Sequence, residues 1–230
     1  MPKRAVLLLS GGLDSTTTAA IARSEGYELY ALTVRYGQRH ASEVEAARRV
    51  AAALGLAAHR VLDLDLASLG GSALTDAHAT IPKDRSLDEI GAPGDVPSTY
   101  VPARNTVLLA LALAWAETLG AEAIFLGVNV LDASGYPDCR AEFVAAFEAL
   151  ARTATRAAVT GASIAIRAPL ITLTKAEIIR RGVALGIDFG LTESCYDPPA
   201  AQFACGRCDA CALRRKGFAE AGVVDPTRYG

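Results

Sequence analysis

The sequence predicts an α/β protein with a doubly wound parallel sheet and a small C-terminal zinc-binding appendage. Short apolar runs alternate with long alanine-rich stretches, as in successive βαβ units. Polar, glycine-rich segments directly follow several of these runs, where open parallel sheets bind ligands. Four of the five cysteines cluster near the end of the 230-residue chain. We therefore expect a principal domain over residues 1–186 and a cysteine-bearing segment over 187–230.

The expected elements follow from the length and period of the apolar pattern. Runs of strand length lie at 5–9, 29–34, 58–63, 123–127 and, more weakly, 163–167. Helical periodicity between and after them covers 14–25, 40–54, 104–119, 141–157 and 174–185. Residues 68–101 are rich in Gly, Ser, Asp and Pro and too long for an ordinary connection, so we expect a functional loop or lid there.

Composition narrows the class of protein. The net charge is −2, which argues against direct nucleic-acid binding over a broad basic face. No apolar run approaches the length of a membrane span, and the first residues lack a full signal sequence. We therefore expect a cytoplasmic protein with small-molecule substrates and no membrane contact.

The first strand runs into Ser10-Gly11-Gly12-Leu13-Asp14-Ser15, where a helix begins. Backbone N–H groups at a helix N-terminus bind anions, and glycines let a phosphate approach closely. A carboxylate repels phosphate, so Asp14 makes sense there if Mg²⁺ lies between them. The plainer alternative is a tight glycine turn with Asp14 or Ser15 capping the helix.

The loop matches neither the Walker pattern nor the dinucleotide fingerprint. Ser-Gly-Gly-x-Asp-Ser instead resembles the PP-loop of the ATP pyrophosphatases, which cleave ATP between its α and β phosphates. This resemblance implies the fold of the adenine nucleotide alpha hydrolase-like (HUP-type) proteins. It also implies ATP binding by Leu9, Ser10, Gly11, Gly12, Leu13, Asp14, Ser15, Thr16, Thr17, Thr18 and Ala19.

Cys195, Cys205, Cys208 and Cys211 supply four thiols within one short segment. Their spacing suits a closed tetrahedral zinc site with a structural role. Unligated cysteines and an iron–sulfur cluster stay open, because ferredoxin-like runs share the spacing. Zinc is favoured because the surrounding chemistry needs no electron. The neighbouring basic residues could contact phosphates, but we expect them to form a solvated face: Arg207, Arg214, Arg215 and Lys216.

Four further strings narrow the substrate: VRYGQRH (34–40), VPARNT (101–106), GVNVLDASGYPDCR (127–140) and APLITLTKAE (168–177). In this order, and with the cysteine cluster, they resemble the 7-cyano-7-deazaguanine synthase family of queuosine biosynthesis. The resemblance covers Arg4 to about Phe218. The chain departs from the family pattern at Leu13, Ala103 and Val130, where Gln, Gly and an acidic residue are usual.

The resemblance implies an ATP-dependent carbon–nitrogen ligase that uses free ammonia to turn 7-carboxy-7-deazaguanine into the nitrile. Acyl-adenylate and adenylated-amide intermediates, bound Mg²⁺ and a homodimer follow from the same resemblance. The catalytic candidates are Asp14, which would bind Mg²⁺, and Arg104 and Lys175, which would counter phosphate charge. The candidates for the deazaguanine pocket are Tyr36, Arg39, Asn129, Tyr136, Asp138 (or Asp132) and Arg140.

Two rival interpretations use the same loop. A tRNA thiolase would need a basic RNA-binding surface and commonly a redox-active cysteine pair or a cluster. The charge of −2 and the Ser-Gly-Tyr-Pro-Asp-Cys string argue against it. A non-catalytic nucleotide-binding module would have no reason to keep Asp14, Arg104 and Lys175 beside the loop. It would bind ATP without releasing pyrophosphate.

Overall fold

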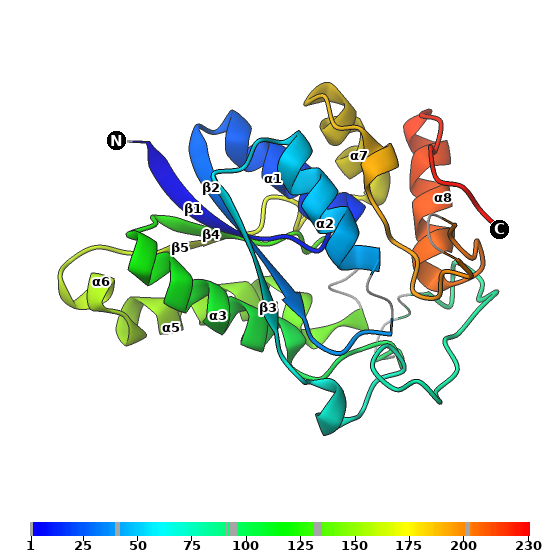
Figure 1. The fold of residues 1–230 in the computed structure, drawn as a ribbon, viewed down its shortest axis with the longest axis horizontal. Helices are drawn as coiled ribbons and strands as arrows, with labels where there is room; N and C mark the ends of the chain where they lie inside the picture. Colours follow the sequence, from blue (N-terminus) through cyan, green and yellow to red (C-terminus); the bar gives the residue numbers. More distant parts are fainter. Residues whose placement is uncertain (1, 40–41, 91, 93–95, 131–134, 201–202) are drawn as a thin grey trace.

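A five-stranded parallel sheet forms the centre of the molecule (Figure 1). The computed structural model describes residues 2–39, 42–90, 92, 96–130, 135–200 and 203–230. The strand order is β3-β2-β1-β4-β5: the first three strands extend the sheet in one direction from β1, and β4 and β5 extend it in the other. The strands are β1 (Lys3–Leu8), β2 (Tyr27–Arg35), β3 (Ala58–Asp63), β4 (Ala123–Phe125) and β5 (Ala165–Arg167).

Helices cover both faces of the sheet, which confirms the doubly wound prediction. Figure 1 shows one layer above the sheet, formed by α1 (Leu13–Ser24), α2 (Ser42–Ala53) and α7 (Lys175–Ala184). The layer below contains α3 (Arg104–Leu119), α5 (Ala141–Ala154) and the short α6 (Arg156–Val159). Among the described residues, no helix is long and apolar enough to cross a membrane.

Alternation along β1 divides the core between the two faces. Leu7 packs with Ala19 of α1 and Val50 of α2, whereas Val6 belongs to the cluster that contains Leu109 of α3 and Phe147 of α5. Successive side chains of a strand point to opposite faces, so a central strand buried on both sides is apolar throughout. This is why the sequence shows an unbroken apolar run here.

The last helix, α8 (Asp209–Ala221), was not among the predicted elements. Its large apolar residues are Leu213 and Phe218 alone, and its first turn contains the last cysteine of the cluster. Its position depends on close packing against α7: a Cβ atom at Gly217 would lie 2.5 Å from Cγ of Lys175. Phe218 of α8 then packs in a third core cluster with Ile178 of α7 and Leu13 of α1.

One helix ends earlier than predicted for a local reason. The expected helix over 141–157 ends at Ala154, because the side chain of Thr155 accepts a hydrogen bond from Ala158 N and caps α6. The expected loop over 68–101 contains the end of a short 3₁₀ helix (Ala67–Leu69) and otherwise no helix or strand among its described residues. The predicted helix over 104–119 and strand over 58–63 are confirmed.

Candidate active site

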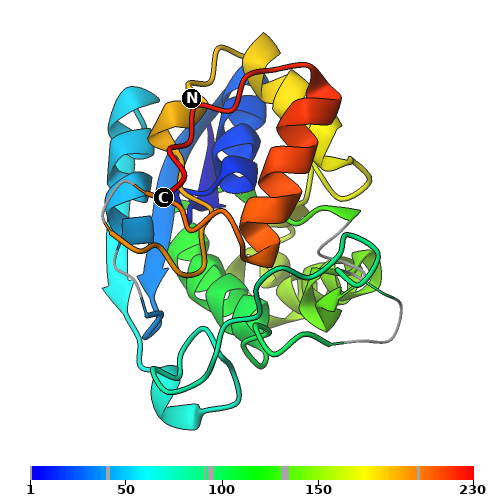
Figure 2. The ribbon, with the colours of Figure 1, turned by 90° about the vertical axis from the view of Figure 1, so that its right-hand side faces the viewer.

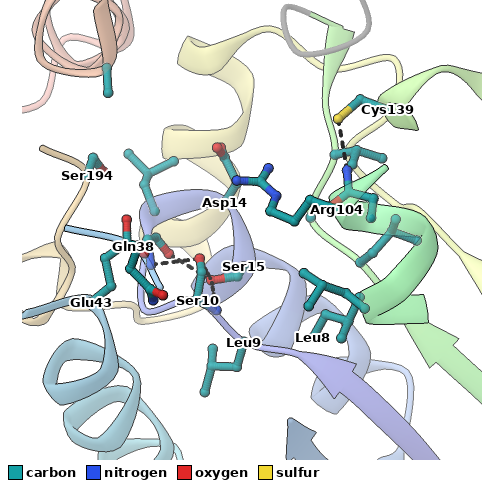
Figure 3. A pocket seen from close by; sticks show the side chains of 18 of the residues that line it. Leu8, Leu9, Ser10, Asp14, Ser15, Gln38, Glu43, Arg104, Cys139 and Ser194 are labelled. Carbon is teal, nitrogen blue, oxygen red and sulfur yellow. Dashed lines mark hydrogen bonds between the residues drawn. The ribbon is translucent and has the colours of Figure 1, made fainter. Parts of the chain in front are cut away.

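A cavity of about 260 Å³ opens at the carboxyl ends of β1, β2 and β4 (Figure 3). Its walls come from the loop after β1, the start of α3, the start of α7 and the segment before the cysteine cluster. The strand order reverses between β1 and β4 at this edge of the sheet. Ligands of doubly wound sheets bind at such a reversal, so the fold and the cavity indicate the same site.

The glycine pair shapes one wall of this cavity. Gly11 has φ +82°, and a Cβ atom there would lie 2.4 Å from Ala47 N and 2.7 Å from the carbonyl oxygen of Glu43. Gly12 precedes α1 as its N-cap, with φ −79°. Only glycine fits the first position, and the loop thereby brings the N-terminus of α1 to the cavity, where free N–H groups favour an anion.

Hydroxyl groups hold the loop in shape from inside. Ser15 Oγ donates to the carbonyl oxygen of Gly12 at 3.2 Å, and Ser10 N donates to Ser15 Oγ at 3.3 Å. On the far side, a Cβ atom at Gly127 would lie 2.9 Å from Ser15 N, so the end of β4 also touches the start of α1. The loop therefore lies between the ends of β1 and β4 on one side and α2 on the other.

Asp14 and Lys175 form an ion pair at the mouth of the loop. Lys175 Nζ lies 2.7 Å from Oδ2 and 3.0 Å from Oδ1 of Asp14. Lys175 is the first residue of α7, and a capping box between Thr174 and Glu177 fixes that helix start. The two predicted catalytic residues therefore meet, although they come from opposite ends of the chain.

Arg104 brings a second positive charge to the cavity. Its Nη1 donates to the hydroxyl of the buried Tyr36 at 3.4 Å. Burial acts to lower the pKa of Arg104, but its interactions with Tyr36, Cys139 and Asp138 outweigh that effect and raise it. Burial raises the pKa of Tyr36. The cavity thus pairs a permanently charged guanidinium with a neutral phenol.

The cavity also holds acidic residues that sequence reasoning missed, Glu43 of α2 and Glu193. Burial raises the pKa of Glu43 from 4.5 to about 7; Arg104 opposes this rise and the charge of Glu193 adds to it. Glu43 follows the VRYGQRH string by three residues and is one of two glutamates in the first turn of its helix. No local pattern separates it from its exposed neighbour Glu45.

The expectation of a solvated basic face is wrong for Arg214. Its side chain is 3% exposed, and it donates to Asp225 Oδ1 at 3.1 Å and to Thr192 Oγ1 at 2.9 Å. It also donates to the carbonyl oxygen of Phe189 at 3.1 Å. The reason is the position of α8, which turns this residue toward the molecule and joins the C-terminal segment to the loop before it.

The four clustered cysteines form a group that could bind a metal. Their Sγ atoms all lie within 4.8 Å of one another, all four side chains are buried, and none forms a disulfide. Backbone N–H groups point at the sulfurs, including Cys205 N to Cys195 Sγ at 3.2 Å and Cys208 N to Cys205 Sγ at 3.4 Å. Hydrogen bonds from Cys195 and Cys211 hold the pKa of Cys208 well below its ordinary value.

The long stretch before α3 is bound to this cysteine segment (Figure 2). Lys83 Nζ lies 2.7 Å from Oδ2 of Asp197, and Arg85 Nη1 lies 3.0 Å from Oδ2 of Asp209. Between them, Asp84 N donates to the carbonyl oxygen of Arg207 at 2.8 Å, and the two side chains form an ion pair. We call residues 72–90 the strap. These contacts attach the strap to the segment that carries the cysteines.

Comparison with known proteins shows the family of this chain. A family model described as "Queuosine biosynthesis protein QueC" matches residues 4–222. The chain belongs to the QueC family. It is 62% identical over 226 residues to a 7-cyano-7-deazaguanine synthase of Azoarcus sp. (strain BH72), covering 98% of this chain and 96% of that protein. Identity is also 62%, over 227 residues, to the synthase of Anaeromyxobacter dehalogenans (strain 2CP-C), covering 99% and 96%.

A solved structure shares the fold of this QueC-family chain. NMN synthetase from Francisella tularensis aligns with a TM-score of 0.51 and 16% identity, over 97% of this chain and 79% of that one. At this identity the likeness concerns the arrangement of strands and helices alone.

The residues predicted to bind ATP in this QueC-family chain form two groups in the structure. Leu9, Ser10, Gly12, Leu13, Asp14 and Ser15 line the cavity, and Gly11 faces α2. Thr16, Thr17, Thr18 and Ala19 are buried within α1 and do not line it. The hydroxyls of Thr16 and Thr17 donate to carbonyl oxygens of the preceding helical turn. Contact with ATP therefore stays a prediction, and the buried threonines support the helix.

The predicted substrate residues divide in the same way. Tyr36 and Tyr136 line the cavity; Tyr136 shares a hydrogen bond with Thr99 (hydroxyl oxygens 3.0 Å apart) and stacks against Tyr100. The other predicted residues do not line it: Arg39, Asn129, Asp138 and Arg140. Their assignment to the substrate pocket stays a prediction, and Asp132 lies outside the described residues.

Asp138 has a clear structural partner instead. Its Oδ2 accepts from Asn105 N at 2.8 Å, and Asn105 Nδ2 donates to the carbonyl oxygen of Asp138 and to Cys139 Sγ. Its carboxylate therefore satisfies a free N–H in the first turn of α3. This contact holds the helix that presents Arg104. Asn129 is fully buried, and Arg39 donates to the carbonyl oxygen of Ala79 in the strap.

Proposed function

We propose that this chain is an ATP-dependent carbon–nitrogen ligase that converts 7-carboxy-7-deazaguanine and ammonia into 7-cyano-7-deazaguanine. The observation that carries the proposal is the cavity at the end of β1, where the glycine loop, the Asp14–Lys175 pair and Arg104 face one space. The proposal is supported by two relatives that are named 7-cyano-7-deazaguanine synthase, are 62% identical to this chain and align with nearly all of it.

In the first stage, the substrate carboxylate attacks the α-phosphorus of ATP and pyrophosphate leaves. The N–H groups at the start of α1 would bind pyrophosphate, since a helix N-terminus stabilises an anion. Lys175 and Arg104 would offset the negative charge that develops on the phosphates. The protein's contribution is orientation and charge compensation, and no covalent nucleophile is needed.

Ammonia then displaces AMP from the acyl adenylate and gives the amide. In a second round, the amide oxygen attacks ATP, and loss of AMP and a proton leaves the nitrile. Both rounds need the same phosphate site, so a single cavity suffices. The aromatic side chains of Tyr36 and Tyr136 would contact the flat deazapurine ring.

Two metals belong to the proposal. Asp14 would hold Mg²⁺, which shields phosphate charge when bound; the ion would take the place of the Lys175 ammonium group, which contacts both oxygens of the Asp14 carboxylate. Cys195, Cys205, Cys208 and Cys211 would hold zinc in a closed structural site. The convergence of four sulfurs and the N–H groups directed at them suit a tetrahedral thiolate site.

Mass spectrometry tests the reaction directly. Metal-replete protein incubated with 7-carboxy-7-deazaguanine, ammonium and MgATP is expected to form first the amide and then the nitrile, with two AMP for each nitrile. Absence of both products would overturn the proposal. ATP binding without pyrophosphate release would instead support a non-catalytic module, and sulfur transfer to tRNA would support a thiolase.

Separate measurements address the metals and the assembly. Asp14→Asn is expected to lose turnover at limiting Mg²⁺, and full turnover would remove its metal role. A colourless protein with one zinc per chain would support the thiolate site, whereas the brown colour of iron–sulfur would contradict it. Light scattering tests the homodimer that the family resemblance implies.

A further inference from the structure

Glu43 is a cavity residue to which the reaction scheme above gives no role. It lies in the first turn of α2 and lines the same cavity as Ser10, Asp14 and Arg104. Figure 3 shows its side chain extending from α2 into that space. Its backbone lies against the glycine loop, since a Cβ atom added at Gly11 would be 2.7 Å from the carbonyl oxygen of Glu43. Glu43 therefore stands beside the glycine loop that faces the reacting phosphates.

The carboxylate of Glu43 differs from that of Asp14 in its partners. Asp14 accepts two hydrogen bonds from Lys175. No hydrogen bond or ion pair to the Glu43 carboxylate is found among the residues that the structure describes. A carboxylate already engaged with an ammonium group is a poor proton acceptor, whereas one without such a partner is available to a ligand in the cavity.

The charged and titratable groups facing Glu43 come from three elements. Tyr36 at the end of β2 and Arg104 of α3 lie on one side, and Glu193 comes from the segment before the cysteines. Glu193 N donates to the carbonyl oxygen of Gly11 at 3.0 Å, which places that residue against the glycine loop as well. Burial raises the pKa of Glu43 to about 7, with Glu193 adding to the rise and Arg104 opposing it. A general base works best when its pKa lies near the working pH.

The chemistry of the amide step favours such a group. At neutral pH, dissolved ammonia is mainly the ammonium ion, which has no lone pair to attack an acyl carbon. A proton acceptor close to the acyl adenylate therefore raises the local supply of ammonia. Lys175 and Arg104 carry positive charge and repel ammonium, whereas the carboxylates of the cavity attract it, and of these Asp14 is already paired with Lys175.

We propose that Glu43 accepts the proton of the ammonium ion that supplies the nitrogen, a role that rests on the proposed function. The Glu43 carboxylate takes one proton from ammonium and becomes a neutral carboxyl group. Ammonia attacks the acyl carbon, the C–N bond forms, and the bond between carbon and the AMP oxygen breaks with its electron pair on AMP. The nitrogen loses a second proton to water as the amide forms, and Glu43 returns its proton to solvent.

The test separates adenylation from amide formation in the intact, metal-replete enzyme. Substrate-dependent exchange of labelled pyrophosphate into ATP needs no ammonia and reports the first stage alone. Glu43→Gln is expected to keep this exchange within about threefold of the wild type. Its rate of amide formation at pH 7 with saturating ammonium is expected to fall by about 10²–10⁴-fold, the usual contribution of a general base.

A nucleophile that needs no deprotonation provides the decisive comparison. Hydroxylamine is mainly uncharged at neutral pH and would give the hydroxamate. The ratio of wild-type to Glu43→Gln rates is therefore expected to shrink to within about tenfold with hydroxylamine. Loss of pyrophosphate exchange in Glu43→Gln, or an equal loss with both nucleophiles, would overturn the role of Glu43. Failure of the wild type itself to form amide from ammonium would instead remove the proposed function.

Two further variants serve as controls. Glu45→Gln removes an exposed carboxylate of the same helix turn, paired only with Arg48 among the described residues, and is expected to leave both rates unchanged. Glu193→Gln removes the charge that helps to raise the pKa of Glu43. The acid limb of the rate–pH profile is then expected to move to lower pH. An unmoved limb would show that Glu43 does not set it.

Discussion

Replacing Gly11 with alanine tests the central contact of the proposed phosphate site. Gly11 has φ +82°, a conformation that costs an L-residue about 1–2 kcal/mol. The added Cβ would also lie 2.4 Å from Ala47 N and 2.8 Å from the carbonyl carbon of Ala46. These are backbone atoms of α2, so no side chain can rotate away, and overpacking of this kind costs about 1–3 kcal/mol. We expect a total loss of about 2–5 kcal/mol in the free energy of unfolding.

Urea unfolding followed by circular dichroism measures this loss, with two glycines of the same chain as controls. Gly26 has φ +86° and nothing within 4 Å of an added Cβ, so Gly26→Ala reports the backbone conformation alone. Gly12→Ala reports the neighbouring loop position without a positive φ, its nearest contact being Ser10 Oγ at 3.3 Å. The expected order of destabilisation is Gly11, then Gly26, then Gly12.

Equal losses for Gly11→Ala and Gly26→Ala would refute the reasoning, because they would show that α2 does not lie against the loop. Affinity for ATP gives a second measurement. If α2 and the loop move apart to admit the methyl group, the N–H groups of α1 lose their orientation and ATP binding weakens. Retained ATP affinity together with a loss of 2–5 kcal/mol would show that the loop shape does not depend on this contact.

Four further predictions follow from the same structure. Folding raises the pKa of Glu43 from 4.5 to about 7, so the free energy of unfolding of the wild type falls as the pH rises between these values. Gln does not titrate, so the free energy of unfolding of Glu43→Gln relative to the wild type is expected to rise by up to about 3 kcal/mol between pH 5 and 8, measured by urea unfolding. Arg214→Leu is expected to cost about 3–5 kcal/mol in the same assay, because it leaves the carboxylate of Asp225 without its buried partner; a loss under 1 kcal/mol would contradict this. Ala103→Gly is expected to stabilise the protein by about 0.5–1 kcal/mol, since Ala103 has φ +53°, and an unchanged midpoint would argue against that strain. Removal of metal by a chelator is expected to speed amide hydrogen exchange in the strap, residues 72–90, before amide exchange in β1 becomes faster. If amide exchange in the strap and in β1 became faster at the same time, the strap would not be held by the cysteine segment.

The sequence alone determined the features that depend on neighbouring residues. The alternation of apolar runs and amphipathic stretches predicted the parallel sheet and the helix over 104–119, because strand and helix periods are local. The loop at Ser10–Ser15 and the spacing of the four cysteines predicted an anion site and a metal-binding group for the same reason. A few residues that are close in the sequence are enough to form an anion site or a set of metal ligands.

The tertiary structure decided which residues meet in the cavity. Glu43 and Glu193 approach the glycine loop from α2 and from the C-terminal segment, and nothing in their own neighbourhoods distinguishes them from exposed glutamates. The carboxylate of Asp138, which is predicted for the substrate pocket, accepts a hydrogen bond from a backbone N–H of α3, and its contact with substrate stays a prediction. Arg214 was expected in water and is buried. Burial and ionisation depend on atoms that are distant in the chain, so they follow only from the packing of helices against one another and against the sheet.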